Sequence, residues 1–210
     1  MEITIENVSK SIKGVPILTD ISLNLCGGMV YGLQGPNGSG KTMLMRLIAG
    51  LIRPTSGLVK INEKVLGREI DFPSSMGLLI ESPAFLPNYT GIKNLELLAS
   101  IQNRIHIQQI RQTLAYVGLD PDDGRKVRKY SLGMKQRLGI AAAVMEQPDL
   151  ILLDEPTNAL DTEGLDQISE LICRERRRGA LIVLASHDVA VLERVSDKVF
   201  TIRDGSIIKQ

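Results

Sequence analysis

The sequence predicts an α/β fold in which a core of parallel strands and helices carries an N-terminal antiparallel β subdomain and an inserted α-helical subdomain. Apolar runs at 29–33, 150–153 and 181–185 have the length of strands that are buried on both faces of a parallel sheet. A glycine-rich stretch joins the first run to a helix-like segment. Apolar residues recur at helical spacing between 92 and 117, which favours a helical insert.

The first part of the chain is expected to be rich in strands. Apolar and polar residues alternate from Met1 to Glu6, which is typical of a strand with one buried face, and Arg53–Gly57 has the composition of a turn. In order along the chain, we expect strands at 1–8, 17–25 and 29–34, a helix at 41–50, a short strand near 58–61 and a core strand that ends at Ile80.

The second part begins as helices and returns to alternating strands and helices. Gly118–Gly124 interrupts the helical spacing, and Asp204–Gly205 is a typical turn of a hairpin. In order along the chain, the pattern becomes helical from about 85, with apolar spacing at 92–101 and 105–117, followed by a helix at 138–145, strand–helix units up to Val195 and a terminal hairpin.

Length and composition favour one domain. A chain of 210 residues with 43% hydrophobic content can bury one sizeable core, and it is too short for two complete copies of such a core. We therefore expect a single domain over 1–210, in which 1–81 and 146–210 form the core with its β subdomain and 82–145 form the helical subdomain.

The segment between the first apolar run and its helix is a Walker A phosphate-binding loop. Glycines let backbone N–H groups surround phosphate oxygens, and the following helix directs the positive end of its dipole at the same anion. Lys41 adds a positive charge for the outer phosphates, and Thr42 offers a hydroxyl to Mg²⁺. The expected nucleotide contacts are Gly35, Pro36, Asn37, Gly38, Ser39, Gly40, Lys41, Thr42 and Met43.

A second motif, Leu150–Pro156, predicts hydrolysis as well as binding. The apolar run ends in adjacent carboxylates, Asp154 and Glu155, at the carboxyl end of a buried strand, where ligands bind in open α/β sheets. Asp154 is expected to hold hydrated Mg²⁺. Glu155 is suited to orienting or deprotonating the attacking water.

A third segment, Tyr130–Arg137, resembles the signature of ABC ATPases, whose usual form is L-S-G-G-Q-x-Q-R. Ser131, Gly133, Gln136 and Arg137 match that form, whereas Tyr130, Leu132 and Met134 replace Leu, Gly and Gln. Asn158–Asp161 is similar to the D-loop of the family, and Ser186–Asp188 is similar to its switch-histidine segment. The chain is therefore identified as a member of this family, which implies a P-loop NTPase (RecA-like) core, ATP as ligand and Mg²⁺ as cofactor.

The resemblance implies that one copy of the chain cannot complete the reaction alone. In the family, two ATPase domains pair head to tail and enclose ATP between the Walker A loop of one and the signature of the other. Ser131, Leu132 and Gly133 would then contact nucleotide bound by a second copy, and Asp161 would reach toward the opposing loop. His187 would contact the γ-phosphate and help Glu155 hold the water. The pair is either a homodimer or a heterodimer with a paralogous ATPase.

Glu81 departs from the family pattern, because most members have glutamine at this position. An ionised glutamate only accepts hydrogen bonds and brings a negative charge near the phosphates, so either its metal contact is stronger or its pKa is raised. Glu81, the segment Pro83–Asn88 and the Ser-Leu-Gly-Met-Lys-Gln signature are similar to ATPases of lantibiotic self-immunity and bacitracin-type export.

A further departure concerns the nucleobase. Family members usually stack adenine on an aromatic side chain of the first hairpin, where this chain has Ile12. An aliphatic side chain packs on adenine without aromatic stacking, so we expect similar affinities for ATP and GTP. Ile12 is equally well explained as an ordinary strand residue.

Charge and hydropathy limit the partners. Twenty-five Lys and Arg against 24 Asp and Glu give a net charge of +1, so no global field points to nucleic acid. The basic run Arg174–Arg178 fits a solvated helix end, and Arg125–Lys129 is either a solvated face or a contact for nucleotide or an acidic partner loop. Cys26 and Cys173 are isolated, as is typical of a reducing cytosol. No apolar run reaches the length of a membrane span, so a spanning partner would be a separate chain.

Together these expectations describe the ATPase subunit of an exporter at the cytoplasmic face of the membrane, with transmembrane permease subunits on separate chains. In the family, a short helix of the permease docks beside the helical insert. Phe85, Leu86 and Tyr89 are candidates for that contact, or they form the small core of the insert. A soluble regulator that acts on ribosomes or DNA, and a sensory ATPase without transport, remain alternatives.

Overall fold

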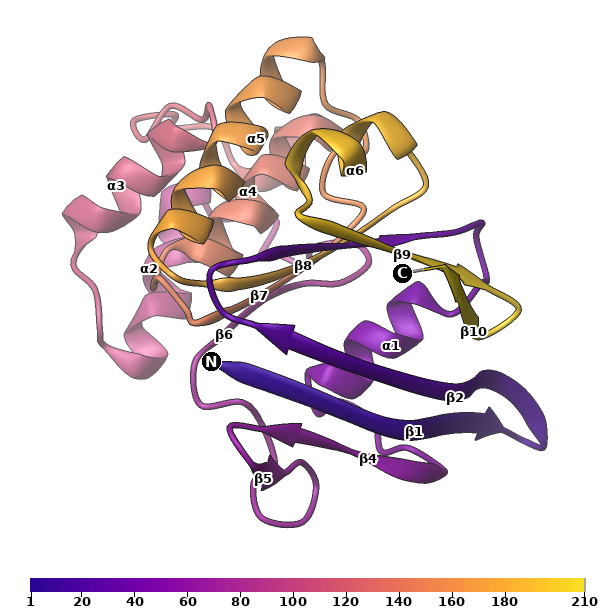
Figure 1. The fold of residues 1–210 in the computed structure, drawn as a ribbon. Coiled ribbons are helices and arrows are strands. Elements are labelled where there is room, and N and C mark those ends of the chain that lie inside the picture. Colours follow the sequence, from indigo (N-terminus) through magenta and orange to yellow (C-terminus); the bar gives the residue numbers. More distant parts are fainter. Residues whose placement is uncertain (210) are drawn as a thin grey trace.

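Two β-sheets pack on opposite sides of one helix, α1 (Lys41–Ile48), in the computed structural model of the chain (Figure 1). The structure describes residues 1–209. Leu44 and Ile48 of α1 belong to the same apolar cluster as Ile3 and Ile5 of one sheet and Leu152 of the other. The helix that follows the Walker A loop is thus held from both sides.

The antiparallel sheet is formed by the N-terminal part of the chain. Its strand order is β2-β1-β4-β5. The register places Ile3 opposite Leu25 and Ile5 opposite Leu23, so apolar side chains gather on the face toward α1. The strands are β1 (Glu2–Ile12), β2 (Val15–Cys26), β4 (Ser56–Ile61) and β5 (Lys64–Val65). The first two are longer than predicted, because they continue to a tight turn at Lys13–Gly14.

The core sheet has the order β10-β9-β3-β8-β7-β6, and all its neighbours are parallel except the β10–β9 pair. In β7, Leu150 and Leu152 face the α1 side, whereas Ile151 and Leu153 face the other helices. Burial of both faces explains the apolar runs in the sequence. The strands are β3 (Val30–Gln34), β6 (Met76–Leu79), β7 (Leu150–Asp154), β8 (Leu181–Ser186), β9 (Lys198–Arg203) and β10 (Ser206–Lys209).

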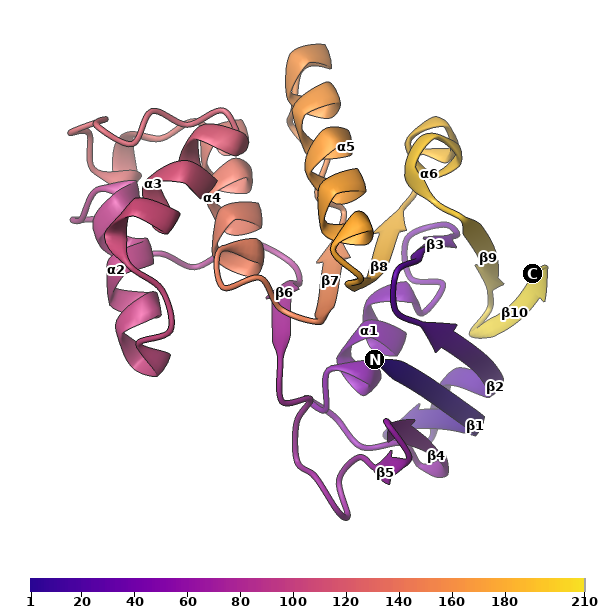
Figure 2. The ribbon, with the colours of Figure 1, turned by 60° about the vertical axis from the view of Figure 1, so that its left-hand side comes forward.

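The remaining helices contribute to the second apolar cluster, and α2 and α3 stand apart from the sheets as the helical insert (Figure 2). The helices are α2 (Gly91–Gln102), α3 (Ile107–Tyr116), α4 (Leu132–Val144), α5 (Thr162–Arg177) and α6 (Val189–Val195), with a 3₁₀ turn at Val127–Lys129. None of the helices within 1–209 is long and apolar enough to cross a bilayer.

The predicted α/β architecture with its β subdomain and helical insert is confirmed, and the differences lie at element ends. The helix expected at 138–145 begins earlier, at Leu132, because the Ser131 hydroxyl caps it by accepting a hydrogen bond from Met134 N at 3.2 Å. The helix expected at 41–50 ends at Ile48. The two-residue strand β5 was not predicted, because it is too short to show an apolar pattern.

Candidate nucleotide-binding site

The predicted site residues follow neighbouring strands of the core sheet. Strands β3, β8, β7 and β6 are adjacent and parallel, so their carboxyl ends meet at one edge. The Walker A loop leaves β3, Asp154 ends β7, and Ser186 ends β8 just before His187. Glu81 follows β6. The topology therefore brings these segments to the edge where ligands bind in α/β folds.

The Walker A loop depends on glycine at positions with left-handed backbone. Gly38 has φ 81° and Gly40 has φ 111°, and a Cβ on Gly40 would lie 2.7 Å from Leu18 Cδ2. Lys41 is buried, and its Nζ donates to the carbonyl oxygens of Gly35 at 2.6 Å and Pro36 at 3.1 Å. The ammonium group is therefore held inside the loop, where it can exchange these carbonyls for phosphate oxygens.

A cleft of about 350 Å³ opens at the loop. Its lining residues are Ile17, Asn37, Gly38, Ser39, Gly40, Lys41, Thr42, Met43, Asp154 and Glu155. The predicted base contact Ile12 is not among them. It lies at the end of β1 with 44% of its surface exposed, whereas Ile17 in β2 supplies the apolar wall. Sequence alone could not choose between the two, because both flank the same turn.

Thr42 and Asp154 form the pair of oxygen ligands that the sequence predicts for Mg²⁺. Thr42 Oγ1 donates to Asp154 Oδ2 at 2.6 Å. Burial raises the pKa of Asp154, and the hydrogen bond from Thr42 opposes this. A hydroxyl and a buried carboxylate beside a phosphate-binding loop are suitable oxygen ligands for this hard cation. The charge of the cation would offset the free-energy cost of burying the ionised Asp154 carboxylate. The residues therefore fit magnesium.

Glu155 and His187 are in direct contact. The carboxylate of Glu155 accepts a hydrogen bond from His187 N at 3.0 Å through Oε1, and its Oε2 lies 2.9 Å from His187 Nδ1. Ser186 Oγ donates to the same Oε2 at 3.4 Å. The predicted base and switch histidine thus form one unit at the ends of β7 and β8.

Glu81 pairs with a residue that the sequence analysis did not consider. Its carboxylate forms an ion pair with the guanidinium of Arg46, on α1. Arg46 lies one helical turn after Thr42 and therefore on the same side of the helix, a spacing that could have indicated it. The negative charge of Glu81 is balanced by arginine, a third possibility beside a stronger metal contact or a raised pKa.

The signature lies outside the cleft. Ser131 caps α4, and Leu132 is 69% exposed. Gly133 packs so closely on the D-loop that a Cβ would lie 2.6 Å from Ala159 O. Asp161 caps α5 by accepting from Gly164 N at 2.9 Å, and it also pairs with Arg137 at 3.2 Å. The D-loop carboxylate therefore already has partners within its own subunit.

The expected roles fit only some of the docking candidates, and they do not fit the basic run Arg174–Arg178. Phe85 packs against the helical core, whereas Leu86 and Tyr89 are exposed. Arg174 and Arg178 contact buried Glu175, so this basic run is more than a solvated helix end.

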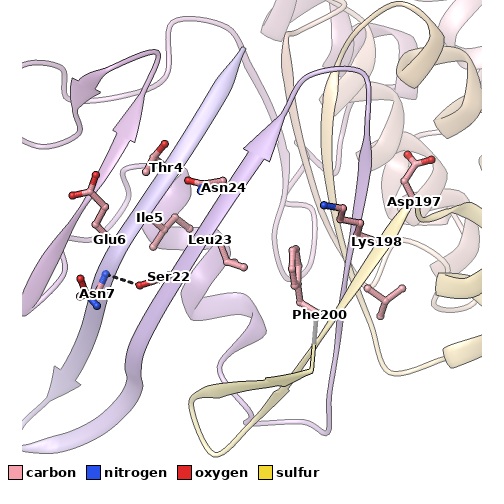
Figure 3. A pocket seen from close by; sticks show the side chains of 11 residues that line it. Thr4, Ile5, Glu6, Asn7, Ser22, Leu23, Asn24, Asp197, Lys198 and Phe200 are labelled. Carbon is pink, nitrogen blue, oxygen red and sulfur yellow. Dashed lines mark hydrogen bonds between the residues drawn. The ribbon is translucent and has the colours of Figure 1, made fainter.

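A larger groove of about 1060 Å³ lies between β1, β2 and β9 (Figure 3). It is lined by polar side chains such as Asn24 and Lys198 and contains none of the predicted site residues. We therefore do not assign the nucleotide to this groove, although its volume exceeds that of the cleft at the Walker A loop.

The sequence is similar to those of known ATP-binding proteins. A family model described as ABC transporter matches residues 18–158. The chain is 45% identical to the uncharacterized ABC transporter ATP-binding protein YybJ of Bacillus subtilis (strain 168), over 88% of this chain and 85% of that protein. It is 35% identical to the bacitracin transport ATP-binding protein BcrA of Enterococcus faecalis, over 98% and 67% of the two chains.

Two further similarities concern lantibiotic transport and the dimeric state. The chain is 36% identical to the lantibiotic transport ATP-binding protein SrtF of Streptococcus pyogenes, over 97% of this chain and 88% of that protein. Its fold matches the ATP-binding cassette MJ0796, a dimer in a post-hydrolysis state bound to ADP and Pi, with a TM-score of 0.88 and 25% identity. That match covers 99% of this chain and 97% of the other.

Proposed function

Because the chain belongs to the ABC transporter family and is one of its ATP-hydrolysing subunits, we propose that it powers export of a peptide antibiotic or a similar amphiphile. The contact between Glu155 and His187 beside the Walker A cleft carries the hydrolytic part of the proposal. The substrate class is supported by the similarity to bacitracin and lantibiotic transport proteins and by Glu81 in place of glutamine.

Nucleotide binding is assigned to the loop and its helix. Backbone N–H groups of the loop and the Lys41 ammonium would bind the phosphates of ATP. Thr42 and Asp154 would hold Mg²⁺, which neutralises the charge that develops on the transferred phosphoryl group. Met43 and Ile17 lie along the cleft, where they can contact the rest of the nucleotide.

Hydrolysis is assigned to Glu155 and His187. Glu155 orients the attacking water and accepts its proton. His187 fixes one carboxylate oxygen through Nδ1 and the other through its backbone N–H, so the carboxylate has a defined direction. Its Nε2 remains free to approach the γ-phosphate. Glu81, held by Arg46, lies at the junction of the core and the helical insert, where we place its contact with the metal-bound nucleotide.

Dimerisation completes the site. Family members pair through their ATPase domains, as in the MJ0796 dimer. Ser131 and Leu132, which are exposed, and half-buried Gly133 lie at the start of α4, where they can meet nucleotide on a second copy or a paralogous ATPase. Asp161 caps its own helix yet is exposed, so it can still approach the opposing loop. Hydrolysis would then separate the two subunits.

The membrane part of the proposal places this subunit at the cytoplasmic face, bound to transmembrane permease subunits on separate chains. It is tested by affinity purification of tagged Glu155→Gln from gently solubilised membranes with Mg-ATP. The double variant Glu155→Gln/Lys41→Ala, which lacks the phosphate-binding ammonium, is the control. A polytopic membrane protein retained with the single variant supports the proposal. Recovery of the ATPase alone, of ribosomes or of DNA contradicts it.

A further inference from the structure

The backbone of Glu155 has a conformation that glutamate rarely adopts. Its φ is 47°, in the left-handed region that is unfavourable for residues with a Cβ. Such a conformation persists only where surrounding contacts hold it. Glu155 stands directly after β7, and the turn at this residue directs its carboxylate toward His187 at the end of β8.

The peptide groups on either side of the Glu155 Cα are held by hydrogen bonds. Glu155 N donates to Ala185 O of β8 at 2.9 Å. Its carbonyl oxygen accepts from Asn158 N at 3.2 Å, a contact within the same turn. The same oxygen accepts from Gln136 Nε2 at 2.9 Å, which is the contact from a distant element.

Gln136 is placed by the signature helix. It belongs to α4, which begins directly after Ser131, and it is only 8% exposed. A buried amide donor is costly to leave without an acceptor, so the hydrogen bond from Gln136 to Glu155 O is strongly favoured over a conformation in which the amide has no acceptor. One rigid helix therefore carries both the residues that face a second copy's nucleotide and the donor that holds the Glu155 peptide.

We propose that Gln136 is a positioning residue for hydrolysis, which holds the Glu155 peptide so that the carboxylate faces His187 and the attacking water. The inference rests on the proposed role of Glu155. The position of the carboxylate then depends on α4, so engagement of the signature by a second copy and orientation of the water are mechanically linked. Loss of the donor should misplace the carboxylate without touching the nucleotide.

The test is steady-state ATPase kinetics of Gln136→Met, which keeps the length of the side chain and removes the donor. We expect kcat to fall roughly 10- to 100-fold, as for small misplacements of a reacting group, with KM for ATP within about twofold. Thr113→Val is the matched control, because it removes a hydrogen bond of 2.9 Å within α3, from the hydroxyl of buried Thr113 to Gln109 O, and does not contact Glu155. It should leave both constants unchanged.

A double-mutant cycle separates positioning from general damage. In the Glu155→Gln background, Gln136→Met should cause no further loss of residual turnover, and the ATP concentration for half-maximal dimerisation should not change. Additive losses, a raised KM or unchanged kcat would each overturn the proposal. If Gln136→Met melts well below Thr113→Val, both constants are measured at a temperature at which both variants are fully folded. Full turnover by Glu155→Gln itself would instead refute the proposed role of Glu155.

Discussion

Asp154 shows how a binding residue can oppose folding. The pKa of its buried carboxyl is raised in the folded protein, chiefly by desolvation, so the folded state binds this proton more tightly than the unfolded chain does. The contribution of this group to stability is therefore fully present below the ordinary carboxyl pKa and is lost as the pH rises through the raised value. Above the raised pKa the ionised side chain destabilises the free protein.

Asp154→Asn should therefore raise the melting temperature of the nucleotide-free protein at pH 7, and the gain should shrink as the pH is lowered toward the ordinary carboxyl range. Asparagine keeps an oxygen that accepts from Thr42 Oγ1 and removes the buried charge. Each 1 kcal/mol gained corresponds to about 2–4 °C. Thermal melts of this variant and of Asp149→Asn, an exposed control before the same strand, provide the measurement. A lowered melting temperature at pH 7 would contradict the argument.

Glu81→Gln should leave ATP affinity within about twofold, because the charge it removes is already paired with Arg46. Both side chains are partly exposed, so the pair itself adds at most about 1 kcal/mol to stability. We expect altered coupling to the transporter, measured as antibiotic resistance in a complementation assay beside nucleotide binding by titration. Unchanged resistance would mean that the acid is incidental. Glu170→Gln, on an exposed face of α5, is the control.

At the scale of single residues, the sequence predicted chemistry better than contacts. The Walker A loop and the carboxylates at the end of β7 were expected at the edge of the sheet because they follow apolar strands, and His187 was expected from the family resemblance. Spacing on α1 places Arg46 on the same side as Thr42, but its partner Glu81 depends on a side-chain direction that spacing does not give. The same holds for Ile17, which lines the cleft where Ile12 does not.

Among the elements, α5 contains a buried charge network near its end. Glu175 is 2% exposed and lies between Arg174 at 3.0 Å and Arg178 at 2.9 Å. The guanidinium of Arg178 also donates to Pro148 O before β7, and that of Arg174 stacks on Tyr116 with 4.0 Å to the ring centroid. The network joins α5 to the helical insert and to the core sheet.

Glu175→Ala should lower the free energy of unfolding by about 3 kcal/mol, because it leaves partly buried arginines without their counter-charge. Glu170→Ala on the same helix is exposed and should change stability by less than about 0.5 kcal/mol. Urea denaturation of both variants provides the comparison. Equal stabilities would mean that the arginines find other partners.

Element interiors were predictable and element ends were less so. Apolar runs in β7 and β8 are buried on both faces, which is a strong signal. The start of α4 at Leu132 depends on one hydroxyl cap, and the early residues of that helix look polar or glycine-rich in sequence. The fold could therefore be predicted from the apolar residues of its core, whereas the ends of its helices depend on capping contacts that the sequence pattern does not show.

For the whole molecule, the signature residues do not line the cleft at the Walker A loop, and Ser131 and Leu132 are exposed, so ATP should promote association of two chains. Glu155→Gln with Mg-ATP should shift from monomer to dimer in analytical ultracentrifugation, whereas hydrolysis by the unaltered protein should keep the dimer transient. Lys41→Ala in the same background should stay monomeric. A Glu155→Gln protein that remains monomeric at saturating ATP would exclude a homodimer and favour a paralogous partner.

The position of α1 between the two sheets also bears on how the chain folds during synthesis. The helix and the loop before it leave the ribosome early, yet β3 pairs with β8 and β9, which begin at Leu181 and Lys198. One apolar side of α1 therefore lacks its sheet until β8 and β9 have been translated. The nascent segment up to β8 is a candidate for chaperone protection, and we expect the ATP site to form only after β8 and β9 have joined β3.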